Sequence, residues 1–151
     1  MKTDHRARAI ILIGPDRMLV IKRIKKPGQP HYYVTCGGGQ EPDDATLIDT
    51  LKREAMEELG ARLRVLRRVL VVTTRLSKNS RVREHFYLCR LVGMNLDRRT
   101  GAEVFDPRRG KYLPHALSLK RRYLARVDLR PPALHDFLLE HTDTLTRAPE
   151  V

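Results

Sequence analysis

The sequence predicts an α/β protein in which helices pack on both faces of a mixed β-sheet. Two observations predict this class: β-rich segments open the chain and follow its middle, while helical periodicity marks one central and one C-terminal segment. At 151 residues the chain can bury about 70% of the surface that its unfolded form exposes, so a core forms without disulfides. We find no repeat or linker, and we therefore expect a single domain over residues 1–151.

The first segments read as strands. Residues 6–13 and 18–24 are rich in β-branched and apolar side chains, and the turn-forming residues 14–17 lie between them, which predicts a hairpin. Residues 31–36 predict a short third strand that runs directly into the glycine triplet at 37–39. The sheet is therefore expected to begin before the first helix.

A helix is predicted next, with Asp43 or Asp44 as its N-cap and Gly60 as its end. Its apolar residues recur at three- and four-residue intervals, and we expect them to form the buried stripe: Ile48, Leu51, Ala55 and Leu59. The helix should therefore pack one face against the sheet.

The second half of the chain predicts more strands and a closing helix. Residues 62–75 read as one long strand or as two strands joined by a bulge. The remaining expectations are a polar link at 79–84, a strand at 85–92, a loop at 95–111, a short strand at 112–117, a helix from the prolines at 131–132 through about His141, and a frayed tail from Thr142.

Charge and cysteine content indicate which partners and which cellular compartment to expect. Thirty Lys and Arg residues against 18 Asp and Glu residues give a net charge of +12, which attracts nucleic acid, acidic membrane surfaces and phosphorylated small molecules alike. No apolar run approaches the roughly 20 residues of a membrane span, and the N-terminus lacks the apolar region of a signal peptide. Cys36 and Cys89 are far apart and form no CxxC pair, so we expect half-buried thiols in the reducing cytoplasm and no membrane partner.

The sequence motifs of zinc sites, serine hydrolases and RNA-recognition domains are not found. The six histidines form no HExxH motif or close pair, which argues against zinc. No GxSxG nucleophile elbow and no RNA-recognition signature is found, although arginines between residues 64 and 75 could form a basic face.

Three acidic residues carry the strongest chemical signal. Glu54, Glu57 and Glu58 lie three and four residues apart on the predicted helix, so their carboxylates share a face and repel one another. A divalent cation removes that repulsion, and an all-oxygen donor set suits Mg²⁺ or Mn²⁺ better than Zn²⁺. Gly38 and Gly39 precede the helix and allow backbone groups to approach a metal or phosphate closely.

Residues 38–61 resemble the Nudix box, the loop-helix-loop signature of the Nudix (MutT-like) hydrolases. The box reads Gly, five residues, Glu, seven residues, then Arg-Glu-hydrophobic-x-Glu-Glu-x-Gly-hydrophobic. Residues 53–61, with the sequence REAMEELGA, match its second half in full, with alanine in both hydrophobic positions. The strands and the closing helix around the box also follow the order of the Nudix α/β/α sandwich.

The first half of the box departs from the pattern. With Gly38 as the box glycine, Asp44 replaces the glutamate and the gap that follows is eight residues long. With Gly39, the spacing is regular but Ala45 stands where the glutamate belongs. We prefer the first alignment, because a one-residue bulge at the start of a helix is easily absorbed. A second departure is Cys36, where the family commonly has proline.

The resemblance implies a Mg²⁺- or Mn²⁺-dependent hydrolase. Glu54, Glu57 and Glu58 correspond to the metal-binding carboxylates, among which we expect Glu57 to matter most. Metal ions bound there would polarise a diphosphate and lower the pKa of the attacking water. Backbone oxygens of Gly38 and Gly39 would face the metal and substrate.

Further roles are implied for residues in and beyond the box. Arg53 would pair with Glu41 or Asp44 and orient the carboxylates. Glu103 is our candidate for the catalytic base or an extra ligand, and Glu84 is its rival. Four cations of the opening hairpin could meet phosphates, of which we select Arg23 for substrate binding: Arg6, Arg8, Lys22 and Arg23.

The expected reaction is cleavage of a nucleoside diphosphate linked to another moiety, of the nucleotide or nucleotide-sugar class. The alternative is a catalytically weak Nudix-like module that binds RNA or a phosphorylated ligand, which the high charge and the irregular box favour. The intact carboxylate cluster favours the enzyme. An isoprenoid-diphosphate isomerase is a third reading without support in these residues, and the substrate and the oligomeric state, including a homodimer, stay open.

Overall fold

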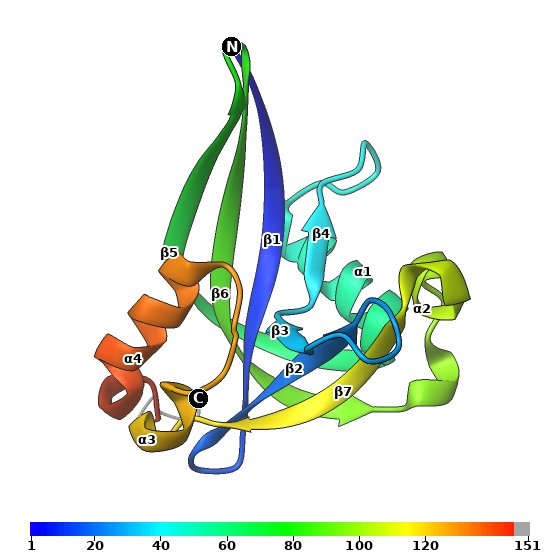
Figure 1. Cartoon of the computed structure of the whole chain (residues 1–151). Coiled ribbons are helices and arrows are strands. Elements are labelled where there is room, and N and C mark those ends of the chain that lie inside the picture. Colours follow the sequence, from blue (N-terminus) through cyan, green and yellow to red (C-terminus); the bar gives the residue numbers. More distant parts are fainter. Residues whose placement is uncertain (147–151) are drawn as a thin grey trace.

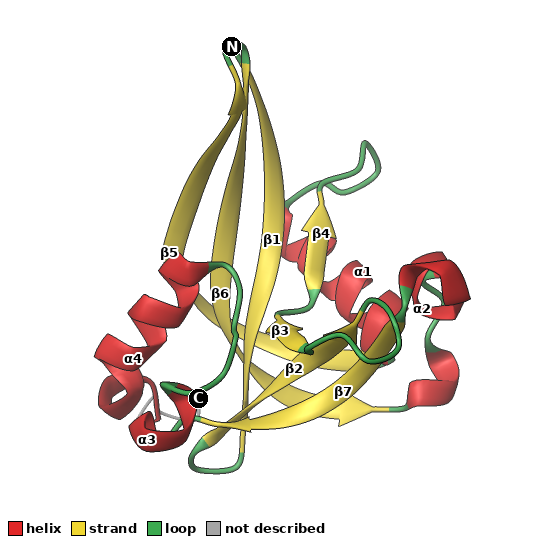
Figure 2. Cartoon of the chain, in the orientation of Figure 1, coloured by secondary structure: helices red, strands yellow, loops and turns green. Residues whose placement is uncertain are grey.

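The computed structural model describes residues 1–146, which form a mixed sheet with helices on both faces (Figure 1). The strands are β1 (Lys2–Ile13), β2 (Arg17–Ile24), β3 (Tyr32–Val34), β4 (Gly37–Gly39), β5 (Ala61–Ser77), β6 (Ser80–Met94) and β7 (Lys111–Ser118). The helices are α1 (Leu47–Leu59), α2 (Ala102–Phe105), α3 (Arg121–Leu124) and α4 (Pro132–Thr146). The strand order is β3-β2-β1-β6-β5, while β4 pairs with β1 and β7 pairs with β2 (Figure 2). The predicted fold class is confirmed.

Alternation along β1 divides the core into two layers. Ile10 and Leu12 point to the face that α4 covers, where they pack with Leu134 and Leu138. Ala9 and Ile11 point to the opposite face, which α1 covers. Because both faces of β1 are buried, its C-terminal half is an unbroken apolar run, as strands between two helical layers generally are.

The opening hairpin is confirmed, and β1 is longer than predicted. Its C-terminal end pairs with β2 across the predicted turn, with Ile11 opposite Leu19. Residues 6–8 pair in antiparallel register with β4, and residues 2–12 pair in parallel register with β6. The predicted third strand at 31–36 is shorter in the structure, where β3 covers Tyr32–Val34, and the glycine triplet that follows forms the separate strand β4.

The start of α1 differs from the prediction. Thr46, not Asp43 or Asp44, is the N-cap, and it forms a capping box with Asp49. Asp44 instead accepts a hydrogen bond from the amide of Glu41 at 2.9 Å, which closes the preceding turn. Ile48 is 38% exposed and lies outside the buried stripe, whereas the predicted C-cap at Gly60 is confirmed with φ of 60°.

The long antiparallel pair β5–β6 contains several bulges, as the sequence allowed for β5. The predicted polar link at 79–84 is wrong, because residues 80–84 belong to β6 and pair with both β1 and β5. The tips of β1, β5 and β6 extend past the helices as a three-stranded ribbon, at the top of Figure 1. We call residues 2–6, 71–77 and 80–85 the ribbon.

The C-terminal third completes the sheet. The predicted loop at 95–111 contains α2 and two short 3₁₀ turns, and the predicted strand near 112–117 is β7. Helix α4 continues to Thr146 with Thr142 and Leu145 buried, so the expectation that the chain frays from Thr142 is wrong for residues 142–146. The rest of that tail lies outside the described residues.

Two further expectations concern the setting of the protein. Cys36 and Cys89 are free thiols, and both are fully buried instead of half-buried, because they pack under α1. Within residues 1–146, no helix has the length and apolar character needed to span a bilayer.

Candidate active site

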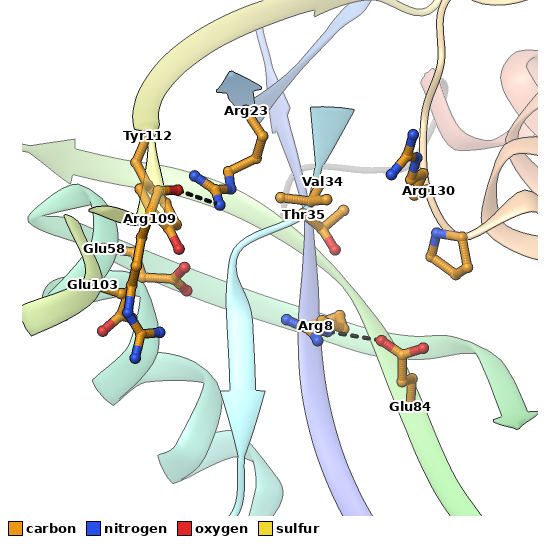
Figure 3. A pocket seen from close by; sticks show the side chains of 11 residues that line it. Arg8, Arg23, Val34, Thr35, Glu58, Glu84, Glu103, Arg109, Tyr112 and Arg130 are labelled. Atoms are coloured by element: carbon orange, nitrogen blue, oxygen red, sulfur yellow. Dashed lines mark hydrogen bonds and ion pairs between the residues drawn. The ribbon is translucent and has the colours of Figure 1, made fainter. Parts of the chain in front are cut away.

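Three carboxylates converge where α1 faces the start of α2. Ligand oxygens of Glu54, Glu58 and Glu103 all lie within 4.8 Å of one another. Figure 3 shows Glu58 and Glu103 side by side at one end of a pocket. Glu54 and Glu58 are buried, while Glu103 is half-buried. The structure therefore brings two of the predicted metal ligands together with the predicted candidate base.

The glycine strand β4 shapes the inner side of this cluster. The backbone amide of Gly37 donates a hydrogen bond of 2.8 Å to Oε1 of Glu58. A Cβ atom on Gly38 would collide with the carboxylate of Glu54, so only glycine leaves that carboxylate in place. The requirement for glycine at position 38 thus comes from the acidic cluster itself.

A short connection holds Glu103 in place. The backbone amides of Thr100 and Gly101 donate hydrogen bonds of 3.1 and 2.9 Å to the carbonyl oxygen of Glu57, near the C-terminal end of α1. These bonds satisfy a carbonyl group at the helix end and dock the segment before α2 against α1. Glu103 follows two residues later and points to Glu54 and Glu58.

Burial and mutual repulsion perturb these acids. Burial raises the pKa of Glu58 to about 8, with a further increase from Glu54 and Glu103, although the Gly37 amide opposes the shift. Burial and the charge of Glu57 likewise raise the pKa of Glu54. A buried carboxylate cluster with only oxygen donors matches the preference of Mg²⁺ and Mn²⁺. The donor set therefore fits a hard divalent cation.

Arg53 connects the other acids around the cluster. Its Nε and Nη2 donate to the two carboxylate oxygens of Asp44 at 3.1 and 2.9 Å, and Nη2 also donates to the carbonyl of Gly39 at 3.1 Å. Its Nη1 lies 3.1 Å from carboxylate oxygens of both Glu54 and Glu57. Hydrogen bonding to Arg53 holds the pKa of Asp44 well below its usual range.

This geometry supports the preferred alignment of the box. Of the two acids expected to pair with Arg53, Asp44 forms the close pair at 2.9 Å, and Glu41 lies farther from the guanidinium at 3.6 Å. Helix α1 begins only after Asp44, with its N-cap at Thr46. Glu57 bonds to Arg53 and is not a member of the converging trio, so its expected role as the most important ligand stays a prediction.

A pocket of about 450 Å³ opens beside the carboxylates (Figure 3). Its lining residues are Arg8, Arg23, Val34, Thr35, Glu58, Glu84, Glu103, Arg109, Tyr112, Arg130 and Pro131. Figure 3 shows Glu58 and Glu103 beside Arg109 at one end of the pocket, whereas Glu84 lies apart from them next to Arg8. A volume in this range accommodates a nucleotide-sized molecule.

The predicted residues Arg23 and Glu84 both line the pocket but have protein partners. Arg23 is buried, donates to the carbonyls of Lys111 and Arg109 at 3.0 and 2.8 Å, and stacks 3.6 Å from the ring centre of Tyr112. Glu84 accepts a 2.9 Å hydrogen bond from Arg8, whose guanidinium also donates to the carbonyl of Gly37. Arg23 therefore anchors the connection before β7.

Other lining residues were missed by sequence reasoning. Arg130 reaches the pocket because its backbone amide donates to the carbonyl of Tyr33 at 3.0 Å, which ties the segment before α4 to β3. Its guanidinium stacks 3.9 Å from the ring centre of Tyr32. No local motif marks Arg109 or Arg130, since each reaches the pocket through tertiary contacts.

Comparisons with known proteins agree with this architecture. The family model of the NUDIX domain matches residues 3–126. A NUDIX hydrolase from Nitrosomonas europaea is similar in structure, with a TM-score of 0.70 and 20% identity over 98% of this chain and 93% of that chain. An ADP-ribose pyrophosphatase from Streptococcus suis has a TM-score of 0.58 and 21% identity over 96% and 90% of the two chains. A UDP-X diphosphatase has a TM-score of 0.66 and 14% identity over 97% of this chain and 66% of that chain.

At these identities the structural likeness shows the fold, whereas the family match covers most of the chain. No curated protein matches it. The chain belongs to the Nudix family, and its fold is the Nudix α/β/α sandwich. It is a hydrolase of the class that acts on phosphoanhydride bonds, in a family that binds nucleotide-type substrates and generally uses divalent metals such as Mg²⁺.

Proposed function

We propose that the protein is a Mg²⁺-dependent pyrophosphohydrolase, active also with Mn²⁺, that cleaves a nucleoside diphosphate linked to another moiety. The observation that carries this proposal is the convergence of Glu54, Glu58 and Glu103 at the wall of an arginine-lined pocket. Carboxylates so placed hold a cation, and the arginines beside them face the anionic part of a substrate.

The metal-binding residues in this proposal are Glu54, Glu57 and Glu58. When bound, a divalent cation neutralises phosphate charge and lowers the pKa of an attacking water. The backbone amide of Gly37 orients Glu58, and Arg53 orients Glu54 and Glu57 through its hydrogen bonds. These contacts fix the carboxylates before the substrate arrives.

Glu103 is the group we assign to proton removal. It is more exposed than Glu54 or Glu58, and it lines the pocket in which a substrate and its attacking water would lie. Glu84 is less suited, because its carboxylate already pairs with Arg8. A base must reach the water without first breaking an ion pair, and Glu103 meets this condition.

The pocket favours substrates with a diphosphate between two organic groups. Both the ADP-ribose pyrophosphatase and the UDP-X diphosphatase that share the fold are named for such substrates. Arg109 and Arg130 approach the pocket from different segments, and their side chains are 62% and 51% exposed. Each also pairs with a neighbouring acid, Arg109 with Asp106 and Arg130 with Asp128, and each keeps further N–H donors for the parts of the substrate that lie beyond the metal.

The alternative is a Nudix-like module that only binds its ligand. Two observations favoured it, the irregular box and the high charge, and the first of these no longer does. The irregular box keeps the pairing of Arg53 with Asp44, so the departure in spacing does not disrupt the carboxylates. The remaining support is the high positive charge, which a hydrolase of anionic substrates shares.

Product release from a substrate panel tests the proposal. The panel contains nucleoside triphosphates, ADP-ribose, nucleotide sugars and diadenosine polyphosphates, each with Mg²⁺, with Mn²⁺ and with a chelator. We expect metal-dependent release of a nucleoside monophosphate, and a loss of turnover by orders of magnitude in Glu57→Gln. For Glu103→Gln we expect a smaller loss, concentrated in kcat and accompanied by an altered pH profile.

Two results would contradict these assignments. Ligand binding without turnover under every metal condition would favour the binding module over the hydrolase. Normal turnover in Glu57→Gln would remove that residue from the metal site, and an unchanged pH profile in Glu103→Gln would move the base role to Glu84 or another residue.

A further inference from the structure

The ribbon carries a basic surface that the active site does not use. Beyond the level of α1, the strands β1, β5 and β6 continue without a helix over either face (Figure 1). The strand register shows that Arg75 lies opposite Arg81, Thr73 opposite Arg83, and Val71 opposite His85. Directly opposed residues point to the same face of a sheet, so these side chains share one face.

Four arginines lie on this face, which is the face that α1 covers lower down. Arg81 is opposite Thr3 and Arg83 is opposite His5 in the parallel pairing with β1. We call the surface formed by Arg68, Arg75, Arg81 and Arg83 the basic ribbon face. Arg68 joins it because its Nη1 lies 3.2 Å from Nδ1 of His85.

The partners of these arginines are neutral. Nε of Arg81 donates to the hydroxyl of Thr3 at 2.7 Å, and Nε of Arg83 donates to the hydroxyl of Thr73 at 3.3 Å. Arg75 donates to two backbone carbonyls at the turn between β5 and β6. A guanidinium has five N–H donors, so each arginine is held in position and keeps donors and full charge for an external anion.

The acidic residues of the ribbon lie on its opposite face. Asp4 pairs with Lys2, and Glu84 pairs with Arg8, and the register places all four on the other side of the sheet. Among residues 1–146, no carboxylate forms an ion pair with an arginine of the basic ribbon face, whereas both acids of the ribbon are paired. The positive charge on this face is therefore not compensated locally.

We propose that the basic ribbon face binds the phosphodiester backbone of a single-stranded nucleic acid. Alternate residues of one strand lie about 6.8 Å apart, so Arg81 and Arg83 present cations in a row, as a chain of phosphates requires. Three strands span only about 10 Å between the outer strand axes, which fits one nucleic-acid strand. Tyr87 lies opposite Arg68, but its ring is buried, so arginine and threonine side chains supply the exposed contacts to phosphate and binding is independent of sequence.

Charge alone does not distinguish this surface from the rest of a protein with net charge +12, so the test needs a control with matched charge. The ribbon variant is Arg75→Gln with Arg81→Gln and Arg83→Gln. The control variant is Arg121→Gln with Arg122→Gln and Arg126→Gln. These control residues are exposed and lie on and just after α3, far from the ribbon in Figure 1.

The probe is a fluorescent 12-nucleotide oligouridylate, with binding followed by anisotropy between 50 and 200 mM salt. We expect the ribbon variant to lose at least about tenfold in affinity at 50 mM salt, and the slope of log K against log salt to shrink by about 2. The control variant should lose less than about threefold. Both variants should unfold at the temperature of the parent protein. If the triple ribbon variant does not fold, the single variant Arg75→Gln, at the exposed turn, replaces it.

Several outcomes would overturn the proposal. Equal losses in both variants would show that net charge alone attracts the strand. Tighter binding to a duplex, to polyglutamate or to phosphatidylserine vesicles at the same salt would assign the face to another anion. The proposal does not depend on the hydrolytic function, because the ribbon variant should hydrolyse small nucleotide substrates at the parent rate whether or not it binds the oligonucleotide.

Discussion

The active site and the ribbon both present arginines, but they hold them in opposite ways. In the site, Arg53 lies within ion-pair distance of four carboxylates: Glu41, Asp44, Glu54 and Glu57. On the basic ribbon face, the arginines are held by hydroxyl, imidazole and carbonyl groups. An arginine saturated by acids orients those acids, whereas an arginine held by neutral groups retains its charge for a ligand. Arginine thus orients carboxylates in the active site, whereas on the ribbon it is free to attract an anionic ligand.

Removing one carboxylate from the site should have the largest effect. Glu58→Gln keeps the side-chain shape but removes a buried charge from the proposed metal site, so we expect kcat/KM to fall at least about 100-fold, equivalent to about 2.7 kcal/mol. Thermal unfolding supplies a second measurement, because Mg²⁺ should raise the Tm of the parent protein but not of this variant. Glu140→Gln, an exposed acid on α4 with the same charge change, is the control. A parent-like Tm shift in Glu58→Gln would exclude Glu58 as a ligand.

The glycines of β4 give a test of geometry without any change in charge. Gly38→Ala places a methyl group on the carboxylate of Glu54, whereas a Cβ on Gly39 meets no atom within 4 Å. We expect kcat/KM to fall about 10- to 100-fold in Gly38→Ala, which matches the cost of displacing a ligand's support, and several-fold less in Gly39→Ala. Equal effects in the two variants would show that the position of Glu54 is unimportant.

The two regions should also differ in whether the effects of paired substitutions add. Arg53→Lys cannot keep the two-pronged contact with Asp44, and we expect about a tenfold loss of kcat. Asp44→Asn should add little to that loss, because both changes break one network. On the ribbon, Arg75→Gln and Arg81→Gln should instead have additive effects on the free energy of oligonucleotide binding. Additive effects of the Arg53 and Asp44 changes on kcat would contradict a shared network.

The smallest expected effect concerns His85, the imidazole that Arg68 holds. Burial, His5 and the nearby arginines lower its pKa, so the folded state resists protonation more than the unfolded state does. The stability that the neutral form supplies is present above the unfolded pKa of about 6.5 and is lost as pH falls through the folded value. Urea unfolding between pH 7 and 5 should show a decline of at most about 1.4 kcal/mol per pH unit from this group. His85→Asn should reduce that decline, and an unchanged slope would exclude His85 as its source.

Local patterns made much of the fold predictable. The hairpin, α1 with its end at Gly60, and β7 follow from turn residues and periodicity that tertiary contacts do not override. The N-cap was misplaced because Asp44 is as good a capping residue as Thr46. In the structure Thr46 forms the capping box with Asp49, while Asp44 pairs with Arg53. Residues 80–84 look like a loop because they are polar, but a strand that leaves the protein body needs no apolar side chains.

The active site was likewise predictable only in part. Glu54, Glu57 and Glu58 were visible as a helical cluster, and Glu103 was visible as an acid in a later segment. Their distances depend on the glycine strand β4 and on the docking of residues 100–101 against α1. Arg109 and Arg130 could not be selected among so many arginines, since their approach to the pocket depends on contacts with distant strands.

The hydrogen bond between Arg130 and β3 joins a late segment of the chain to an early one, so the pocket forms only after most of the chain has been synthesised. Ribosomal synthesis delivers the N-terminal strands first. The pocket wall nevertheless needs Arg8 at one end of the sequence and Arg130 with Pro131 at the other. The parallel pairing of β1 with β6 also waits for about 80 further residues, a separation that slows folding. The nascent chain therefore contains the complete sequence of α1 well before it contains all residues of the pocket.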